Sequence, residues 1–233
     1  MKNARPNPPA IRGRNAEERL ANVRENIARM CKPARREPED VTLIAVSKTH
    51  GAEAIRPLLE AGQRDFGENR VAEAQDKWPG LREEFADVRL HLVGQLQSNK
   101  AEDAVALLDC IHSLDRPSLL KALAKAMDKA DRRVPCFVQV NIGDEPQKGG
   151  CAISDTPALI AAAREADIPL AGLMCIPPAE IEAAPFFALL AKLAHDNGLA
   201  GLSMGMSGDY ETAVQLGATH VRVGTALFGA RGG

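Results

Sequence analysis

The chain has 233 residues, a formal net charge of −2 and 45% hydrophobic residues. This length suits one α/β barrel without requiring a second domain, and the hydrophobic fraction can fill a large core. A net charge near zero gives no general attraction to nucleic acid or to an anionic membrane, and no apolar run approaches the ~18 residues of a membrane span. We therefore expect neither nucleic acid nor a membrane as a partner.

The five cysteines are scattered along the chain and form no CxxC pair. This distribution favours a reducing compartment and argues against a disulfide framework or a zinc site. The N-terminus combines basic residues with prolines and lacks the apolar stretch of a secretory signal. We therefore predict a disordered tail over residues 1–13, a single domain over residues 14–233 and a cytoplasmic location.

Apolar residues at helical spacing predict a first helix over residues 14–30. Apolar, β-branched runs then alternate with amphipathic stretches of helical length. The predicted strands are residues 41–48, 64–68, 89–94, 110–114, 135–142, 169–175, 201–205 and 219–224. The predicted helices between them are residues 51–61, 70–78, 99–108, 117–130, 154–166, 180–196 and 208–216. No helix is expected after the last strand.

Strands that alternate with helices indicate parallel pairing with right-handed crossovers, and eight of them fit a closed (β/α)8 barrel. The first helix would cover the place of the helix missing after the eighth strand. A doubly wound open sheet is the structural alternative, but no GxGxxG motif follows any strand, which disfavours its dinucleotide-binding version. The predicted fold class is α/β, a single TIM-type barrel with an additional N-terminal helix.

The first predicted strand, VTLIAVSK, ends in a lone lysine, Lys48. Alternation along a strand puts Lys48 on the same face as Ile44 and Val46. Partial desolvation there would lower the pKa of the lysine and make its amine a better nucleophile for a carbonyl. Taken alone, a lysine that emerges into solvent at a strand end is the simpler interpretation.

The carboxyl ends of the strands form one rim of a barrel, where ligands bind. Lys48 and Asn69 reach this rim, and the small-residue stretches SMGMSGD and VRVGTALFG follow the last two strands. Ser207 is expected where the helix after the seventh strand begins, and a serine with free N–H groups at a helix start suits a phosphate. A plain N-cap is the alternative role for Ser207.

Arg222 is expected to point into the barrel, because Val221 and Val223 alternate with it and should face the helices. A buried arginine needs an acceptor, which is either a carboxylate in a structural salt bridge or a ligand atom. An amine, an arginine and a phosphate site on adjoining strand ends make up a pyridoxal phosphate (PLP) site. In such a site the lysine forms the Schiff base and the arginine meets the pyridine nitrogen.

The five histidines show no metal-ligand spacing such as HExxH, and no metal is predicted. His91 and His112 fall in predicted strands, where hydrogen-bonded core histidines are more common than catalytic ones. Asp144, Glu145 and Lys148, after the fifth strand, are typical of a loop that covers the rim.

Several blocks, in order, resemble the pyridoxal phosphate homeostasis proteins (the YggS/PROSC-like family), whose fold is like the barrel domain of alanine racemase. The resemblance runs from about residue 15 to 231. It rests on LIAVSKTH around Lys48, FGENRVAEAQDK at 66–77, HLVGQLQSNK at 91–100, IHSLDR at 111–116, GLMCIPP at 172–178 and a closing block at 202–231. The stretches NIGDEPQKGG and CIPP depart from the usual family pattern.

The resemblance implies a set of cofactor-binding residues, which are Lys48, Asn69, Met206, Ser207, Arg222, Gly224 and Thr225. Lys48 is implied as the Schiff-base lysine, Arg222 as the partner of the pyridine nitrogen, and Ser207, Gly224 and Thr225 as phosphate ligands. The implied function is intracellular PLP homeostasis. The protein would buffer PLP and deliver it to apoenzymes through transient contacts, as a monomer and without robust catalysis.

A PLP-dependent amino-acid racemase is the alternative function. An arginine at the ring nitrogen makes the pyridine a poorer electron sink, and a racemase also needs an acid/base group on the opposite face. Tyr210 is the only tyrosine in the chain. A barrel enzyme that acts on a phosphosugar without PLP is a third possibility, and it predicts a colourless protein.

Overall fold

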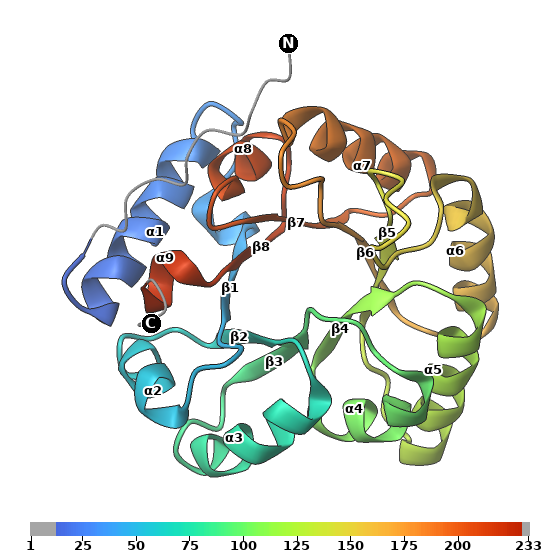
Figure 1. The fold of residues 1–233 in the computed structure, drawn as a ribbon, viewed down its shortest axis with the longest axis horizontal. Coiled ribbons are helices and arrows are strands. Elements are labelled where there is room, and N and C mark those ends of the chain that lie inside the picture. Colours follow the sequence, from blue (N-terminus) through green and yellow to red (C-terminus); the bar gives the residue numbers. More distant parts are fainter. Residues whose placement is uncertain (1–12, 230–233) are drawn as a thin grey trace.

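The computed structural model describes residues 13–229, so the predicted tail lies outside the described residues except for Gly13. Within them, eight parallel strands follow one another around a closed barrel (Figure 1). The strands are β1 (Thr42–Val46), β2 (Asp65–Glu68), β3 (Arg89–Leu92), β4 (Cys110–Leu114), β5 (Cys136–Val140), β6 (Leu170–Cys175), β7 (Gly201–Met206) and β8 (His220–Val223). The predicted α/β barrel is therefore confirmed.

Helices surround the barrel on its outside (Figure 1). They are α1 (Ala16–Cys31), α2 (Ala52–Glu60), α3 (Val71–Glu84), α4 (Ala101–Leu107), α5 (Pro117–Ala130), α6 (Thr156–Glu165), α7 (Ala184–Asp196), α8 (Tyr210–Gln215) and α9 (Thr225–Phe228). Between residues 13 and 229 there are also three short 3-10 segments, η1 (Pro38–Asp40), η2 (Ser98–Lys100) and η3 (Ile153–Asp155).

Helix α1 occupies the place predicted for it, against α8, α9 and α2. It begins after Asn15, whose side chain accepts the Glu18 N–H at 2.8 Å, and this cap satisfies one of the unpaired donors of the first turn. The prediction that no helix follows the eighth strand is wrong, because the one-turn helix α9 comes directly after β8. Buried Leu227 anchors that turn, which is too short to give a periodic pattern.

Helix α3 runs to Glu84, past the end predicted at residue 78. Pro79 lies inside this helix, where a proline removes one hydrogen bond and crowds the preceding turn. Trp78 and Leu81 are both buried, and their burial against the barrel offsets that cost. Helix α7 starts at Ala184 instead of residue 180, since residues 176–183 form a rim loop.

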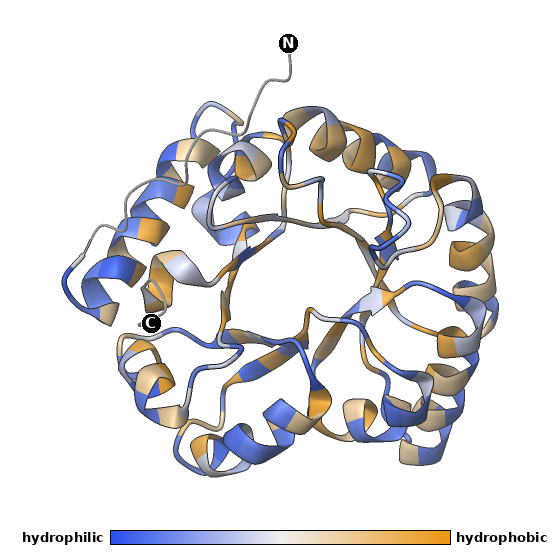
Figure 2. Cartoon of the chain, viewed as in Figure 1, coloured by the Kyte–Doolittle hydropathy of each residue, from blue (hydrophilic) through white to orange (hydrophobic). Residues whose placement is uncertain are grey.

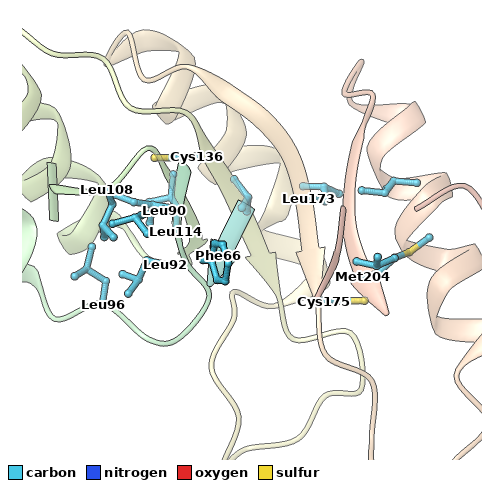
Figure 3. Packing of buried hydrophobic residues seen from close by; sticks show 14 of the residues in the cluster. Phe66, Leu90, Leu92, Leu96, Leu108, Leu114, Cys136, Leu173, Cys175 and Met204 are labelled. Atoms are coloured by element: carbon cyan, nitrogen blue, oxygen red, sulfur yellow. The ribbon is translucent and has the colours of Figure 1, made fainter. Parts of the chain in front are cut away.

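The main hydrophobic core lies between the barrel and the helices. Each outer helix carries hydrophobic and hydrophilic positions (Figure 2), and Figure 3 shows part of the packing around Leu90 and Leu92 of β3. A smaller cluster of Cys110, Phe137 and Met174 fills part of the barrel interior. The five cysteines are buried thiols. Among the described residues, none of the helices has the length and apolar character needed to cross a membrane.

Candidate functional site

A cavity of about 880 Å³ opens at the carboxyl ends of the strands. It is large enough for a cofactor-sized ligand. All the residues predicted to bind a ligand line this cavity, namely Lys48, Asn69, Met206, Ser207, Arg222, Gly224 and Thr225. The elements that carry them, β1, β2, β7 and β8 with their loops, are neighbours around the barrel. Closure of the barrel pairs Ile44 of β1 with Arg222 of β8 and thus brings the two ends of the chain to one site.

Lys48 is half-buried and lies two residues beyond β1, which is shorter than the predicted strand. The turn that carries it is closed by a 3.1 Å hydrogen bond from His50 N to Ser47 O. Lys77 of α3 donates to the carbonyl oxygen of Ser47 at 3.0 Å and to that of His50 at 3.1 Å. Thr49 adopts a left-handed φ of 64°, and its N–H bonds the Glu73 carboxylate. The backbone at Lys48 is thus held from α3, while its long side chain extends to the cavity.

The turn also rests on a fully buried carboxylate, Glu68 of β2. Its Oε1 accepts hydrogen bonds from Ser47 Oγ at 2.7 Å and from Trp78 Nε1 at 3.1 Å, and Lys77 Nζ lies 2.7 Å away. No sequence pattern indicated this role for Glu68, Lys77 or Trp78. Glu68 directly precedes Asn69, so one element supplies both a support for the turn and a lining residue of the cavity.

Ser207 does not cap the helix after β7, so the alternative role as an N-cap is wrong. Helix α8 starts at Tyr210 after the N-cap Asp209, whose Oδ1 accepts the Met206 N–H at 2.6 Å. Ser207 Oγ instead accepts the N–H groups of Gly224, at 3.2 Å, and Ala226, at 3.4 Å. As the acceptor of two N–H groups, the hydroxyl keeps its own proton to donate to an oxyanion in the cavity.

Arg222 points into the barrel as predicted and is 4% exposed. Its Nη1 donates to Ser203 Oγ at 2.6 Å and its Nη2 to the Cys175 carbonyl at 2.9 Å. Both acceptors are neutral, in contrast to the salt bridge that was the alternative. Burial lowers the pKa of Arg222, and Cys175 and Asp209 partly oppose this effect. Arg222 lines the cavity, so its remaining N–H groups can donate to a ligand.

His91 and His112 are buried, hydrogen-bonded strand residues, as predicted. Together with Cys110 they place three metal-ligating atoms within 4.8 Å of one another, which the spacing in the sequence did not indicate because two strands contribute them. His91 Nδ1 and His112 Nε2 are bonded to each other at 2.9 Å, and burial raises the pKa of the Cys110 thiol far above its ordinary value. The cluster is thus organised by hydrogen bonds.

The loop after β5 reaches the cavity through Gln147, Lys148 and Gly149. Lys148 Nζ lies 2.6 Å from Glu145 Oε2 and donates to the Pro177 carbonyl at 3.2 Å. A Cβ on Gly149 would stand 1.7 Å from the Gln95 amide nitrogen, so a larger residue here would force the flexible Gln95 side chain to move. The loop therefore packs over the rim against the loops that follow β3 and β6.

This barrel with a cavity at its strand ends has the architecture of the alanine racemase N-terminal domain, and the pattern of that family matches residues 19–232. The pyridoxal phosphate homeostasis protein of Pseudomonas aeruginosa is 41% identical over 222 residues, covering 92% of this chain and 95% of that protein. The protein of the same name from Escherichia coli (strain K12) is 38% identical over 228 residues, which cover 91% of this chain and 95% of that protein.

A solved structure of PipY from Synechococcus elongatus PCC7942, with PLP bound, has a TM-score of 0.82 and 38% identity to this chain. The similarity covers 92% of this chain and 100% of that one. The chain therefore belongs to the pyridoxal phosphate homeostasis protein family.

Proposed function

We propose that this protein binds PLP in the rim cavity, holds it as a Schiff base with Lys48, and acts in PLP homeostasis by buffering the cofactor and delivering it to apoenzymes. One observation carries the proposal. An amine just beyond β1, a buried guanidinium on neighbouring β8 and the Ser207 hydroxyl, which contacts the start of α9, converge on one cavity. The names of the relatives and the PLP-bound structure of PipY support the same ligand.

The donor set of the cavity fits PLP group by group. Arg222 can only donate, so it suits an unprotonated pyridine nitrogen. The Ser207 hydroxyl, with Gly224 and Thr225 at the first turn of α9, suits the phosphate, while Asn69 and Met206 line the remaining wall. When bound, PLP supplies an aldehyde that reacts with an amine, and Lys48 is the lysine whose backbone the surrounding turn holds in place.

Carriage without robust catalysis is favoured over racemisation by the position of Tyr210. Its side chain is 2% exposed, and its hydroxyl accepts a 3.0 Å hydrogen bond from Asn26 of α1, outside the barrel. Burial raises the pKa of Tyr210. This tyrosine therefore does not face the cavity as an acid or base. We place the protein in the cytoplasm as a monomer that meets its client apoenzymes transiently.

The visible absorption spectrum of the purified protein with PLP tests the proposal. We expect an absorption band of the Schiff base that borohydride removes, and we expect Lys48→Ala to abolish it. Lys100→Ala is the matched control, because Lys100 pairs with Asp103 on the exposed surface. A wild-type protein that stays colourless with added PLP would refute the cofactor and favour a barrel enzyme for a phosphosugar.

A second pair of assays separates the carrier from the racemase. The carrier predicts that an apoenzyme becomes active when mixed with the PLP-loaded protein, and that a panel of amino acids shows no α-proton exchange in deuterated water. Rapid exchange with retention of the cofactor would establish the racemase instead.

A further inference from the structure

A continuous line of hydrogen-bonded side chains crosses the interior of the barrel. Asp65 Oδ1 lies 3.0 Å from His91 Nε2, and His91 Nδ1 lies 2.9 Å from His112 Nε2. His112 Nδ1 lies 2.8 Å from Ser203 Oγ, which accepts the 2.6 Å hydrogen bond of Arg222. We call these five side chains the interior relay. It joins the cavity to Asp65 at the amino-terminal end of β2, where exposed Arg89 pairs with the carboxylate.

The charge at each end of the relay determines the direction of its hydrogen bonds. Burial acts to raise the pKa of Asp65, but hydrogen bonds from His91 and Arg89 outweigh it and leave this pKa below its ordinary value. An ionised carboxylate only accepts, so His91 has a proton on Nε2 that points to Asp65, and in the neutral ring Nδ1 is then the acceptor. At the other end, Arg222 only donates.

The two central members are then determined as well. Burial lowers the pKa of His112 well below its ordinary value, and electrostatic interactions with His91, His220 and Arg222 act in the same direction. A neutral His112 that donates from Nε2 to His91 has its acceptor at Nδ1. The Ser203 hydroxyl must therefore donate its one proton to His112, and it can serve Arg222 only as an acceptor.

Neighbouring rings leave the relay little freedom to rearrange. Phe137 stacks on His112 with ring centroids 4.5 Å apart, and His220 meets the edge of Phe137 at 4.9 Å. Because the relay is buried, breaking any one of its hydrogen bonds leaves a desolvated polar atom without a partner, which costs free energy. The orientation of the Ser203 hydroxyl toward Arg222 thus depends on His112, His91 and, at the other end of the barrel, Asp65.

We propose that the interior relay positions Arg222 for a ring-nitrogen ligand in the cavity, so that Asp65, His91, His112 and Ser203 contribute to PLP retention without touching it. This inference rests on the proposed function and deepens it. Arginine does not release its proton, so the relay moves no net proton into the cavity. It transmits orientation and polarisation along a chain of cooperative hydrogen bonds.

Two variants and one control test the role of the relay. Ser203→Ala removes the acceptor of Arg222 and the donor to His112, and Asp65→Asn removes the terminal charge. Ser113→Ala is the matched control, because Ser113 is fully buried beside His112 and its hydroxyl has no hydrogen-bond partner among residues 13–229. We expect Ser203→Ala and Asp65→Asn to raise the dissociation constant of PLP about tenfold, as for loss of a charge-assisted hydrogen bond, and Ser113→Ala to leave it unchanged.

Nitrogen NMR of the histidine side chains gives a readout that a purely structural role would not move. In the protein without PLP, we expect separate resonances for His91 and His112, with His112 neutral and its proton on Nε2. Saturating PLP should shift both sets of resonances in the wild-type protein, and Ser203→Ala should remove these shifts while PLP still binds. The measurement of the PLP-induced shifts in the wild-type protein needs no variant, so it can be made even if Asp65→Asn fails to fold.

The outcomes separate the relay from the proposed function. A wild-type protein that binds no PLP overturns both. Normal PLP binding together with an unchanged dissociation constant in Ser203→Ala, or with His112 protonated on Nδ1 at neutral pH, overturns the relay alone. A tenfold loss in Ser203→Ala without loss of the histidine shifts would also overturn it, since the coupling would not run through His112.

Discussion

Lys77 and Glu68 form a buried ion pair beside the turn that carries Lys48, with Nζ and Oε1 2.7 Å apart. The pair joins α3 to β2, and Lys77 also binds the carbonyl groups of Ser47 and His50. Desolvation of two charges can cancel their attraction, so such a pair need not add net stability. Its value here is positional, because it fixes the backbone on both sides of Lys48.

Loss of one member of this pair should be far more costly than loss of both. Lys77→Met leaves the Glu68 carboxylate buried without its cation, which we expect to destabilise the protein by ~3–5 kcal/mol in urea unfolding. The double variant Glu68→Gln/Lys77→Met should recover much of that loss, since a glutamine oxygen still accepts from Ser47 and Trp78. Lys192→Met removes an exposed pair with Asp196 and should cost under ~1 kcal/mol. Equal losses in the single and double variants would contradict this account.

Two glycine-to-alanine substitutions should act in opposite directions. A Cβ on Gly94 would stand 2.3 Å from the backbone oxygen of Asn69, and a rigid backbone cannot yield cheaply. We expect Gly94→Ala to destabilise the protein by roughly 1–3 kcal/mol and to weaken PLP binding, because Asn69 lines the cavity. Gly80 lies inside α3 with nothing within 4 Å of its added Cβ, so Gly80→Ala should stabilise by ~0.5–1 kcal/mol. Thermal unfolding with and without PLP measures both, and a stabilised Gly94→Ala would refute the close contact.

Stability should fall in mildly acidic solution, because buried histidines resist protonation. Burial, with the electrostatic interaction of His91 next, lowers the pKa of His220 to about 4, and burial lowers the pKa of His112 well below its ordinary value. Below pH ~6.5 the unfolded chain binds protons that the folded protein refuses, so stability is full above that pH and is lost as the pH falls. For His220 alone the loss by pH 4 is at most about 3 kcal/mol.

Urea unfolding of the protein without PLP at pH 7.5, 6.5, 5.5 and 4.5 checks this dependence. His220→Phe should reduce the change of the unfolding free energy with pH. The phenylalanine ring should fit there, since the His220 ring already packs among aromatic neighbours. His195→Ala should leave the slope unchanged, because His195 is an exposed residue of α7. A stability that is flat between pH 7.5 and 4.5 would show that the folded protein takes up these protons freely.

Removal of the Ser207 hydroxyl should discriminate between ligands with and without a phosphate. Ser207→Ala loses a donor to an oxyanion and leaves the Gly224 and Ala226 N–H groups without their acceptor. We expect PLP affinity to fall about tenfold, the usual effect of one charge-assisted hydrogen bond, and pyridoxal affinity to stay the same. Equilibrium dialysis with both ligands measures this, and exposed Ser154→Ala is the control. Equal losses of affinity for PLP and pyridoxal would show that Ser207 does not bind the phosphate.

Much of the fold followed from local pattern. Strand and helix periods along residues 41–224 predicted the eight strands and the seven helices between them, and the alternation of Val221, Arg222 and Val223 placed the arginine inside the barrel. One error came where a local signal opposed a tertiary one. Pro79-Gly80 is typical of a helix end, yet buried Leu81 carries α3 onward.

Local patterns were enough to predict the barrel, the rim at which ligands bind and seven residues of its cavity, because strand alternation and strand ends are local properties of the chain. How those residues are held depends on contacts that form only in the folded chain. Ser207 meets the start of α9, Lys77 fixes the turn at Lys48, and the relay reaches Asp65 from Arg222. Each of these contacts joins residues at least 17 positions apart, and such pairings depend on closure of the barrel, which no short stretch of sequence encodes.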